Sequence, residues 1–142
     1  MNIIIKFTKK LLEFILYSVL LIALAIILFL FITSSVRKYE QYKMIRCFKE
    51  NSTLFEAFMS GDRNIEHKIK GNIYYTVTPE FEELGVESID QEFEGNISFE
   101  QKHWVLGMIP HGIIYVGNID TIPRWVKIEP ISGYWYYYRI VS

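Results

Sequence analysis

The sequence predicts an α+β protein in which a single N-terminal transmembrane helix is followed by a small, mostly antiparallel β domain with one or two short helices. Three observations predict this class. An uncharged apolar run lies near the N-terminus, apolar and polar residues alternate in the second half, and glycines and prolines divide that half into short segments. The 142 residues leave room for one ordinary domain. We expect its sheet to be a curled meander or a small open barrel.

Residues 14–32 form the apolar run. Fifteen of these nineteen residues are Leu, Ile, Phe or Val, and none is charged. As a helix the run is about 28 Å long at ~1.5 Å per residue, close to the ~30 Å hydrocarbon core of a bilayer. The run is longer than the apolar part of a cleaved signal peptide and ends without an A-x-A-like site, so we expect an uncleaved signal anchor.

Charge divides the chain into two parts. Residues 1–50 carry eight basic and three acidic residues, a balance of +5, whereas residues 51–142 carry seven and thirteen, a balance of −6. We therefore expect a basic N-terminal tail (1–10), the transmembrane helix (11–33), a basic helical juxtamembrane stalk (34–50) and a soluble β-rich domain (51–142). The acidic balance of this domain argues against a nucleic-acid partner, because the domain would repel phosphate.

Charged residues flank the apolar run, where the membrane interface is expected: Lys9, Lys10, Glu13, Arg37 and Lys38. On a helix, Glu13 can pair with either lysine at the headgroup level. A short basic tail before a long apolar run is typical of a signal anchor, which predicts a cytoplasmic N-terminus and a domain outside the inner or plasma membrane. The larger number of basic residues after the run slightly favours the reverse orientation.

A long N-terminal helix carrying a β domain resembles a type IV pilin in layout, and Leu11-Leu12-Glu13 resembles the apolar pair and glutamate of the pilin N-terminus. The pilin processing site requires a glycine, and neither Thr8 nor Lys9 supplies it. The resemblance therefore covers the layout alone.

Two short helices are predicted by their capping patterns. Thr53 and Glu56 form a capping-box pattern for a helix over residues 54–59. A second helix has an N-cap, a proline at its first position and a terminating glycine, at Thr78, Pro79 and Gly85.

Alternation between residues 65 and 77 predicts a strand pair with one buried face, on which His67 is partly buried. A three-residue loop, residues 70–72, pairs Ile69 with Ile73 and keeps that face apolar, so we prefer it to a two-residue loop.

Further strands are predicted over residues 86–93, 97–105, 112–116, 123–129 and 134–141. The tripeptide Gly-Asn-Ile occurs at Gly71, Gly95 and Gly117, either as convergent turn chemistry or as a true internal repeat. If these three glycines adopt positive φ in hairpins, a β-branched residue there would be strained.

No catalytic, cofactor-binding or metal-binding motif stands out in the sequence. The three histidines, His67, His103 and His111, fall in no zinc-binding spacing, and Cys47 is the single cysteine. We therefore expect a protein that is not an enzyme and has no cofactor. A membrane-anchored enzyme of unknown class is the alternative.

Two features point to a protein partner. Acidic residues cluster between residues 80 and 94, among them Glu82, Glu83 and Glu87. They form either an acidic docking surface or an ordinary solvated face. The strand predicted near the C-terminus is aromatic on both faces. It is either a contact surface or a strand that is covered on both sides. Its aromatic residues are Tyr134, Trp135, Tyr136, Tyr137 and Tyr138. We expect a membrane-anchored binding module of a bacterial-type cell envelope, resembling an immunity or inhibitor protein or an accessory subunit, with a basic protein as its partner. The oligomeric state stays open.

Overall fold

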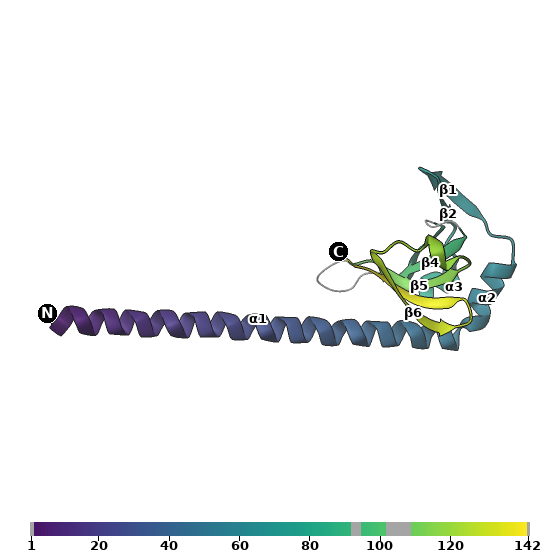
Figure 1. Ribbon diagram of the computed structural model, residues 1–142. Coiled ribbons are helices and arrows are strands. Elements are labelled where there is room, and N and C mark those ends of the chain that lie inside the picture. Colours follow the sequence, from purple (N-terminus) through teal and green to yellow (C-terminus); the bar gives the residue numbers. More distant parts are fainter. Residues whose placement is uncertain (1, 92–94, 102–108, 142) are drawn as a thin grey trace. The chain divides into compact units, whose positions relative to one another are not determined.

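The computed structural model describes residues 2–91, 95–101 and 109–141, and it confirms the predicted α+β class (Figure 1). A long apolar N-terminal helix is followed by an open antiparallel sheet and short helices. In chain order the described elements are α1 (Asn2–Glu50), α2 (Ser52–Ser60), β1 (Ile65–Ile69), β2 (Asn72–Tyr75), α3 (Pro79–Glu83), β3 (Val86–Gln91), β4 (Asn96–Gln101), β5 (His111–Val116), the 3₁₀ helix η1 (Ile119–Thr121), β6 (Val126–Ser132) and β7 (Trp135–Ile140).

Helix α1 continues for 49 residues, because its sequence contains neither glycine nor proline to end it. By length and composition it can cross a membrane, and none of its most apolar stretch is buried within the chain. The chain divides into two compact units, Met1–Glu40 and Gln41–Ser142. The last turns of α1 therefore belong to the same unit as the sheet, where Gln41 donates a hydrogen bond from its side-chain nitrogen to the carboxylate of Glu129 on β6.

The sheet is antiparallel with the strand order β1-β2-β3-β4-β5-β7-β6. The first five strands follow one another as a meander. The chain then passes through η1 to β6 at the sheet edge and returns as β7, which fills the place between β5 and β6. Gly133, with φ of 56°, lies in the turn that joins β6 to β7.

The predicted loop of the first hairpin is wrong. Its turn has two residues, Lys70 and Gly71, with φ of 49° and 91°, so Ile69 pairs with Asn72. Positive φ at both central residues is typical of a type I′ turn, whose twist matches that of the flanking strands. The reasoning failed because β1 is exposed along its whole length, and a strand with no buried face does not fix its register by apolar pairing.

His67 is therefore exposed, not partly buried as predicted. Its ring stacks on the ring of Tyr74 on β2, with 4.6 Å between the ring centroids and 15° between the planes. Ile65, at the start of β1, is 50% exposed.

The two predicted short helices are present, but the capping box is wrong. Helix α2 begins one residue after Asn51, so Thr53 lies inside the helix. Glu56 accepts a hydrogen bond from the indole nitrogen of Trp135 at 2.6 Å instead of turning back to the helix start. Helix α3 follows Thr78 and begins with Pro79, and Gly85 lies just after its end with φ of 82°.

The later strands overlap the predicted ranges. Strand β3 ends at Gln91 and β4 at Gln101, while residues 92–93 and 102–105 of the predicted strands lie outside the described residues. Gly71 and Gly95 have positive φ as expected, but Gly117 does not. A Cβ at Gly117 would lie 2.3 Å from the carbonyl oxygen of Gly95, so this glycine is required by close approach of the backbones.

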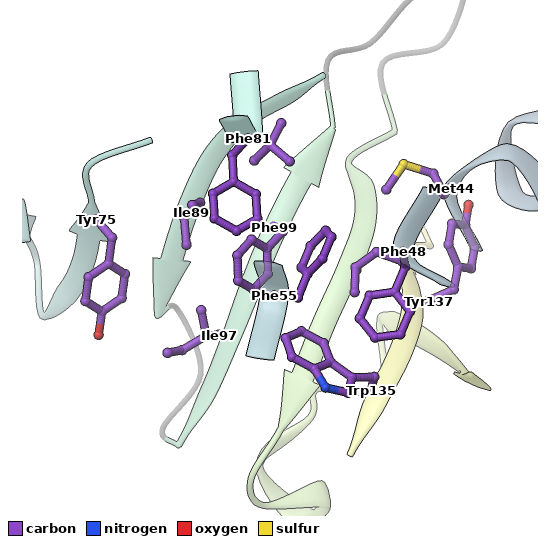
Figure 2. Packing of buried hydrophobic residues seen from close by; sticks show 12 residues of the cluster. Met44, Phe48, Phe55, Tyr75, Phe81, Ile89, Ile97, Phe99, Trp135 and Tyr137 are labelled. Atoms are coloured by element: carbon purple, nitrogen blue, oxygen red, sulfur yellow. The ribbon is translucent and has the colours of Figure 1, made fainter. Parts of the chain in front are cut away.

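One face of the sheet, called here the packed face, is covered by apolar side chains from three helices (Figure 2). Phe55 of α2 lies at the centre of this cluster. Its ring centroid is 5.0 to 5.7 Å from those of its aromatic neighbours, which are Phe48 of α1, Phe81 of α3, Phe99 of β4 and Trp135 of β7. Edge-to-face pairs of this kind contribute about 0.5–1.5 kcal/mol each beyond area burial. Met44 and Phe48 make the end of α1 part of this core.

Candidate functional site

The acidic residues between 80 and 94 separate into two groups. Glu82 and Glu83 on α3 and Glu87 on β3 are exposed, as is Glu80, and together they form an acidic surface. A hydrogen bond from the side chain of Thr78 and a second from the backbone N–H of Glu80 lower the pKa of the Glu80 carboxyl. Glu92 and Glu94 lie outside the described residues.

Asp90 belongs to a different environment, because its side chain is only 7% exposed. It lies on the second face of the sheet, opposite to the packed face. Such burial of a carboxylate is costly unless hydrogen-bond donors surround it. The hydroxyl of Ser98 donates to Oδ1 of Asp90 at 2.8 Å, and the hydroxyl of Ser88 donates to Oδ2 at 3.4 Å.

The aromatic strand β7 is mostly interior. Trp135 and Tyr137 belong to the packed face, and Tyr138 is buried in a second apolar cluster with Ile114, Val116 and Val126. Tyr136 is half-buried against that second cluster, whereas Tyr134, just before the strand, is 64% exposed. Burial on both faces explains the unbroken aromatic run. Of these five side chains, Tyr134 has the largest exposed surface.

A cavity of about 260 Å³ lies on the second face of the sheet. Its described walls come from five strands and one loop residue. The polar walls are Tyr74, Ser88, Asp90, Ser98 and Glu100, and the other walls are Pro110, Val126, Tyr138 and Ile140. Residues of β2 and β6 line the same cavity although four strands separate them in the sheet order, so the sheet curls toward this face.

Two short sequence patterns build the polar wall. Ser88-Ile89-Asp90 on β3 and Ser98-Phe99-Glu100 on β4 are both polar–apolar–polar, and strand geometry sends the middle residue to one face and its neighbours to the other. Ile89 pairs with Phe99 across the strands, and both are fully buried on the packed face. The second face therefore receives two serines and two carboxylates.

The register of β3 and β4 fixes the arrangement of these four side chains. Asp90 pairs with Ser98, and Ser88 pairs with Glu100. Each carboxylate thus has a serine opposite it, and the two carboxylates occupy a diagonal, where side chains on neighbouring strands lie roughly 7–8 Å apart. Sequence reasoning missed this site because it grouped Asp90 with the exposed acids. The matching patterns of the two strands were the available signal.

The interface residues predicted from the sequence are all exposed on α1. Lys9, Lys10 and Glu13 precede the most apolar part of the helix, and Arg37 and Lys38 follow it. Further along the helix, Arg46 forms a salt bridge with Glu50, with 2.8 Å between the guanidinium nitrogen and the carboxylate oxygen. Both of those side chains are exposed, so the pair contributes little to stability.

Within the described ranges, no group of three or more His, Cys, Asp or Glu side chains is arranged to hold a metal ion. His67 and His111 are far apart in the sheet order, on β1 and β5, and His103 lies outside the described residues. No known protein family, curated protein or solved structure matches the chain.

Proposed function

We propose that this chain is a single-pass, membrane-anchored binding module of a bacterial-type cell envelope, and that it is not an enzyme. The observation that supports membrane anchoring is the exposure of the apolar run. The large apolar side chains of residues 14–32 are exposed along α1, and none of its most apolar stretch is buried. Apolar surface of this extent is unfavourable in water. Insertion of the fifteen Leu, Ile, Phe and Val residues into a bilayer is favourable by roughly 5–9 kcal/mol.

The proposed arrangement places the basic tail, residues 1–10, in the cytoplasm and the β-rich domain outside the inner membrane. Lys9, Lys10 and Glu13 then lie at one membrane interface, and Arg37 and Lys38 at the other. These residues are exposed, and long basic side chains near helix ends can extend to the headgroups.

Topology is tested by adding protease to intact spheroplasts that contain the full chain. We expect the β-rich domain to be degraded without lysis, because it faces outward. A domain that survives until the cells are lysed would reverse the proposed orientation. Fractionation supplies the test of anchoring, since recovery in the soluble fraction at low salt, without detergent, would refute the membrane helix.

The proposed partner is a basic protein, for which the module acts as an inhibitor or an accessory subunit. Support comes from the balance of −6 over residues 51–142 and from the exposed acidic surface of Glu80, Glu82, Glu83 and Glu87. Surface charges of this kind mainly accelerate encounter with a partner of opposite charge. They are screened by salt, because the Debye length falls from about 10 Å at 0.1 M to about 3 Å at 1 M.

A pull-down with the full chain in detergent tests this partner. We expect a stoichiometric basic protein whose association slows as salt is added. Replacing Glu82, Glu83 and Glu87 with Gln should mainly reduce the association rate. A matched control removes the same amount of charge elsewhere, at the exposed Asp62, Glu66 and Asp120. Equal slowing by both triple variants, or association indifferent to salt, would exclude this acidic surface as the docking surface.

A further inference from the structure

We propose that strand β1 pairs edge to edge with β1 of a second copy of this chain, so that two copies share one continuous antiparallel sheet. The two strands are related by a two-fold axis that passes beside His67. This inference goes beyond the proposed function, and it rests on the proposed membrane anchor only for the strength of the contact.

Strand β1 has an open edge. It pairs with β2 on one side, and no described strand lies on its other side. Figure 1 shows the β1–β2 hairpin at one end of the sheet. All five residues of β1 are exposed, and its two isoleucines, Ile65 and Ile69, are 50% and 51% exposed. In an antiparallel ladder, alternate residues direct their N–H and C=O groups away from the neighbouring strand. The outer edge of β1 therefore presents backbone groups to which a further strand can add.

The sequence of β1 is complementary to itself when two copies run antiparallel. Its order is Ile65, Glu66, His67, Lys68, Ile69, so an acid and a base lie at equal distances from the central histidine. With His67 beside His67 of the second copy, Glu66 lies opposite Lys68 and Ile65 lies opposite Ile69, and each pair occurs twice. Opposite charges on directly facing residues stabilise an antiparallel pair, whereas like charges destabilise it.

Charge also selects this register over its neighbours. Moving the axis by one residue along the strand would set Glu66 opposite Glu66 of the second copy, and moving it in the other direction would set Lys68 opposite Lys68. Both alternatives bring like charges together. The register centred on His67 is therefore the favoured one for self-pairing.

The opposite edge of the sheet, β6, is protected against the same reaction. Pro130 has no N–H to donate, and the carboxylate of Glu129 already accepts a hydrogen bond from Gln41 of α1. An antiparallel contact of β1 with β6, centred on His67 and Ile128, would set acid opposite acid and base opposite base. Pairing through β1 uses the same surface on both copies, so it closes at two chains.

The contact is short, with five residues on each side, and the register shift between Ile65 and His67 disturbs the start of the strand. Small interfaces are weak between freely diffusing chains. Two chains anchored by α1 in one bilayer are confined to the same plane, which raises the effective concentration of one β1 near the other. We therefore expect the pairing in membranes and its loss on dilution in detergent.

The test is disulfide cross-linking of the full chain in isolated membranes, with Cys47→Ser as the background. His67→Cys should cross-link efficiently, because directly facing Cα atoms of antiparallel strands are about 4.5–5.5 Å apart, within the ~4.4–6.8 Å range of disulfides. Glu66→Cys alone should cross-link poorly, since the two copies of position 66 lie on a diagonal of roughly 7–8 Å. Expressed together with Lys68→Cys, it should form a mixed dimer.

The matched control is Lys127→Cys, which is exposed on the opposite edge and should not cross-link. No cross-linking of His67→Cys would overturn the proposal. So would equal cross-linking of Glu66→Cys alone and in the mixture, because it would show collision without a register.

Charge reversal supplies an independent test, read as the cross-linking of His67→Cys. Glu66→Lys and Lys68→Glu each bring like charges together, so each should lower the yield about tenfold or more. The two variants expressed together should cross-link with each other as well as the natural chains do, because every facing pair is again of opposite sign. Asp120→Lys makes the same change of charge at an exposed position of η1 and should have no effect. Failure of the mixture to recover, or an equal loss in Asp120→Lys, would refute the pairing.

These outcomes are separable from the proposed function. If membranes hold the chain but His67→Cys does not cross-link, the pairing fails while the anchored module stands. If the chain is recovered in the soluble fraction, the anchor fails, and recovery of cross-linking by the charge-reversed mixture still decides the pairing. The control for the basic partner that includes a change at Glu66 should weaken self-pairing and keep the association rate with that partner, so the two interactions are measured apart.

Discussion

The packed face of the sheet is filled by side chains from three helices, whereas the second face leaves a cavity beside the same two central strands. Both faces are built from β3 and β4, and alternate residues of each strand serve one face or the other. Ile89 and Phe99 are at most 1% exposed in the apolar core, while the neighbouring Asp90 and Ser98 line the cavity. The difference teaches that alternate residues of one strand pair can build an apolar core on one face and a polar cavity on the other.

The largest effect is expected on the packed face. Phe99→Ala should lower the free energy of unfolding by about 3–5 kcal/mol, because Phe99 is fully buried among Phe55, Phe81 and Trp135 and its removal leaves a void. Urea unfolding of the full chain in detergent, followed by tryptophan fluorescence, measures this. Glu100→Ala, one residue away on the other face, is the control. A loss below about 1 kcal/mol for Phe99→Ala would show that the packed face does not dominate stability.

The second largest effect is expected where strands approach too closely for any side chain. A Cβ at Gly112 would lie 2.0 Å from the carbonyl oxygen of Phe99, so Gly112→Ala must push β5 away from β4 at a cost of about 3 kcal/mol. At Gly71 nothing lies within 4 Å, and Gly71→Ala is opposed only by the positive φ of 91°, at about 1 kcal/mol. Equal changes in melting temperature for the two variants would contradict this ranking.

A smaller effect is expected at the cavity. Ser98→Ala removes the 2.8 Å hydrogen bond to the buried carboxylate of Asp90 and should destabilise the fold by about 1–3 kcal/mol. Ser88→Ala removes only the longer 3.4 Å contact and should cost less. The same urea titration measures both, and the double variant Ser98→Ala with Asp90→Asn shows whether the two groups are coupled. A larger loss in Ser88→Ala than in Ser98→Ala would contradict the geometry.

The smallest effect concerns the thiol of Cys47 on α1, between the core residues Met44 and Phe48. Burial, and secondarily the charge of Glu50, raise its pKa above the ordinary 9.0, while Lys43 and Asn51 oppose the shift. Since the folded pKa is raised, the neutral thiol contributes stability that is present below pH 9 and is lost as the pH rises through the folded pKa. Iodoacetamide at pH 8 should therefore alkylate the folded chain several-fold more slowly than the urea-unfolded chain. Equal rates would show that the end of α1 is not held against the packed face.

Elements whose signals are local could be predicted from the sequence. The apolar run of α1 and the Thr78-Pro79 start of α3 carry their own signals within a few residues, and the structure has both helices. The pairing register of the first hairpin could not be predicted, because the apolar residues of β1 stay exposed and place no constraint on pairing. The helix α2 was predicted for a wrong reason, since Glu56 bonds to Trp135, which lies 79 residues later.

The candidate site depended on pairings that no local pattern fixes. Asp90 lines a cavity with Glu100 only because β3 pairs with β4 in the register that sets Ile89 opposite Phe99. Likewise, the aromatic side chains of β7 are buried because that strand lies inside the sheet and not at its edge. The sequence showed that the strand was unusual, but its burial on two faces required knowledge of its neighbours.

The strand order also has a consequence for folding during synthesis. Strand β6 is synthesised before β7, yet in the sheet it is joined to β5 only through β7. At a synthesis rate of about 5–20 residues per second, β6 must therefore remain unpaired until residues 135–140 are made. During that interval β5 presents its apolar residues Ile113 and Ile114 on an open edge, which is a template for pairing with another chain. A chaperone or membrane surface that shields β5 at this stage would raise the yield of folded protein without changing its final stability.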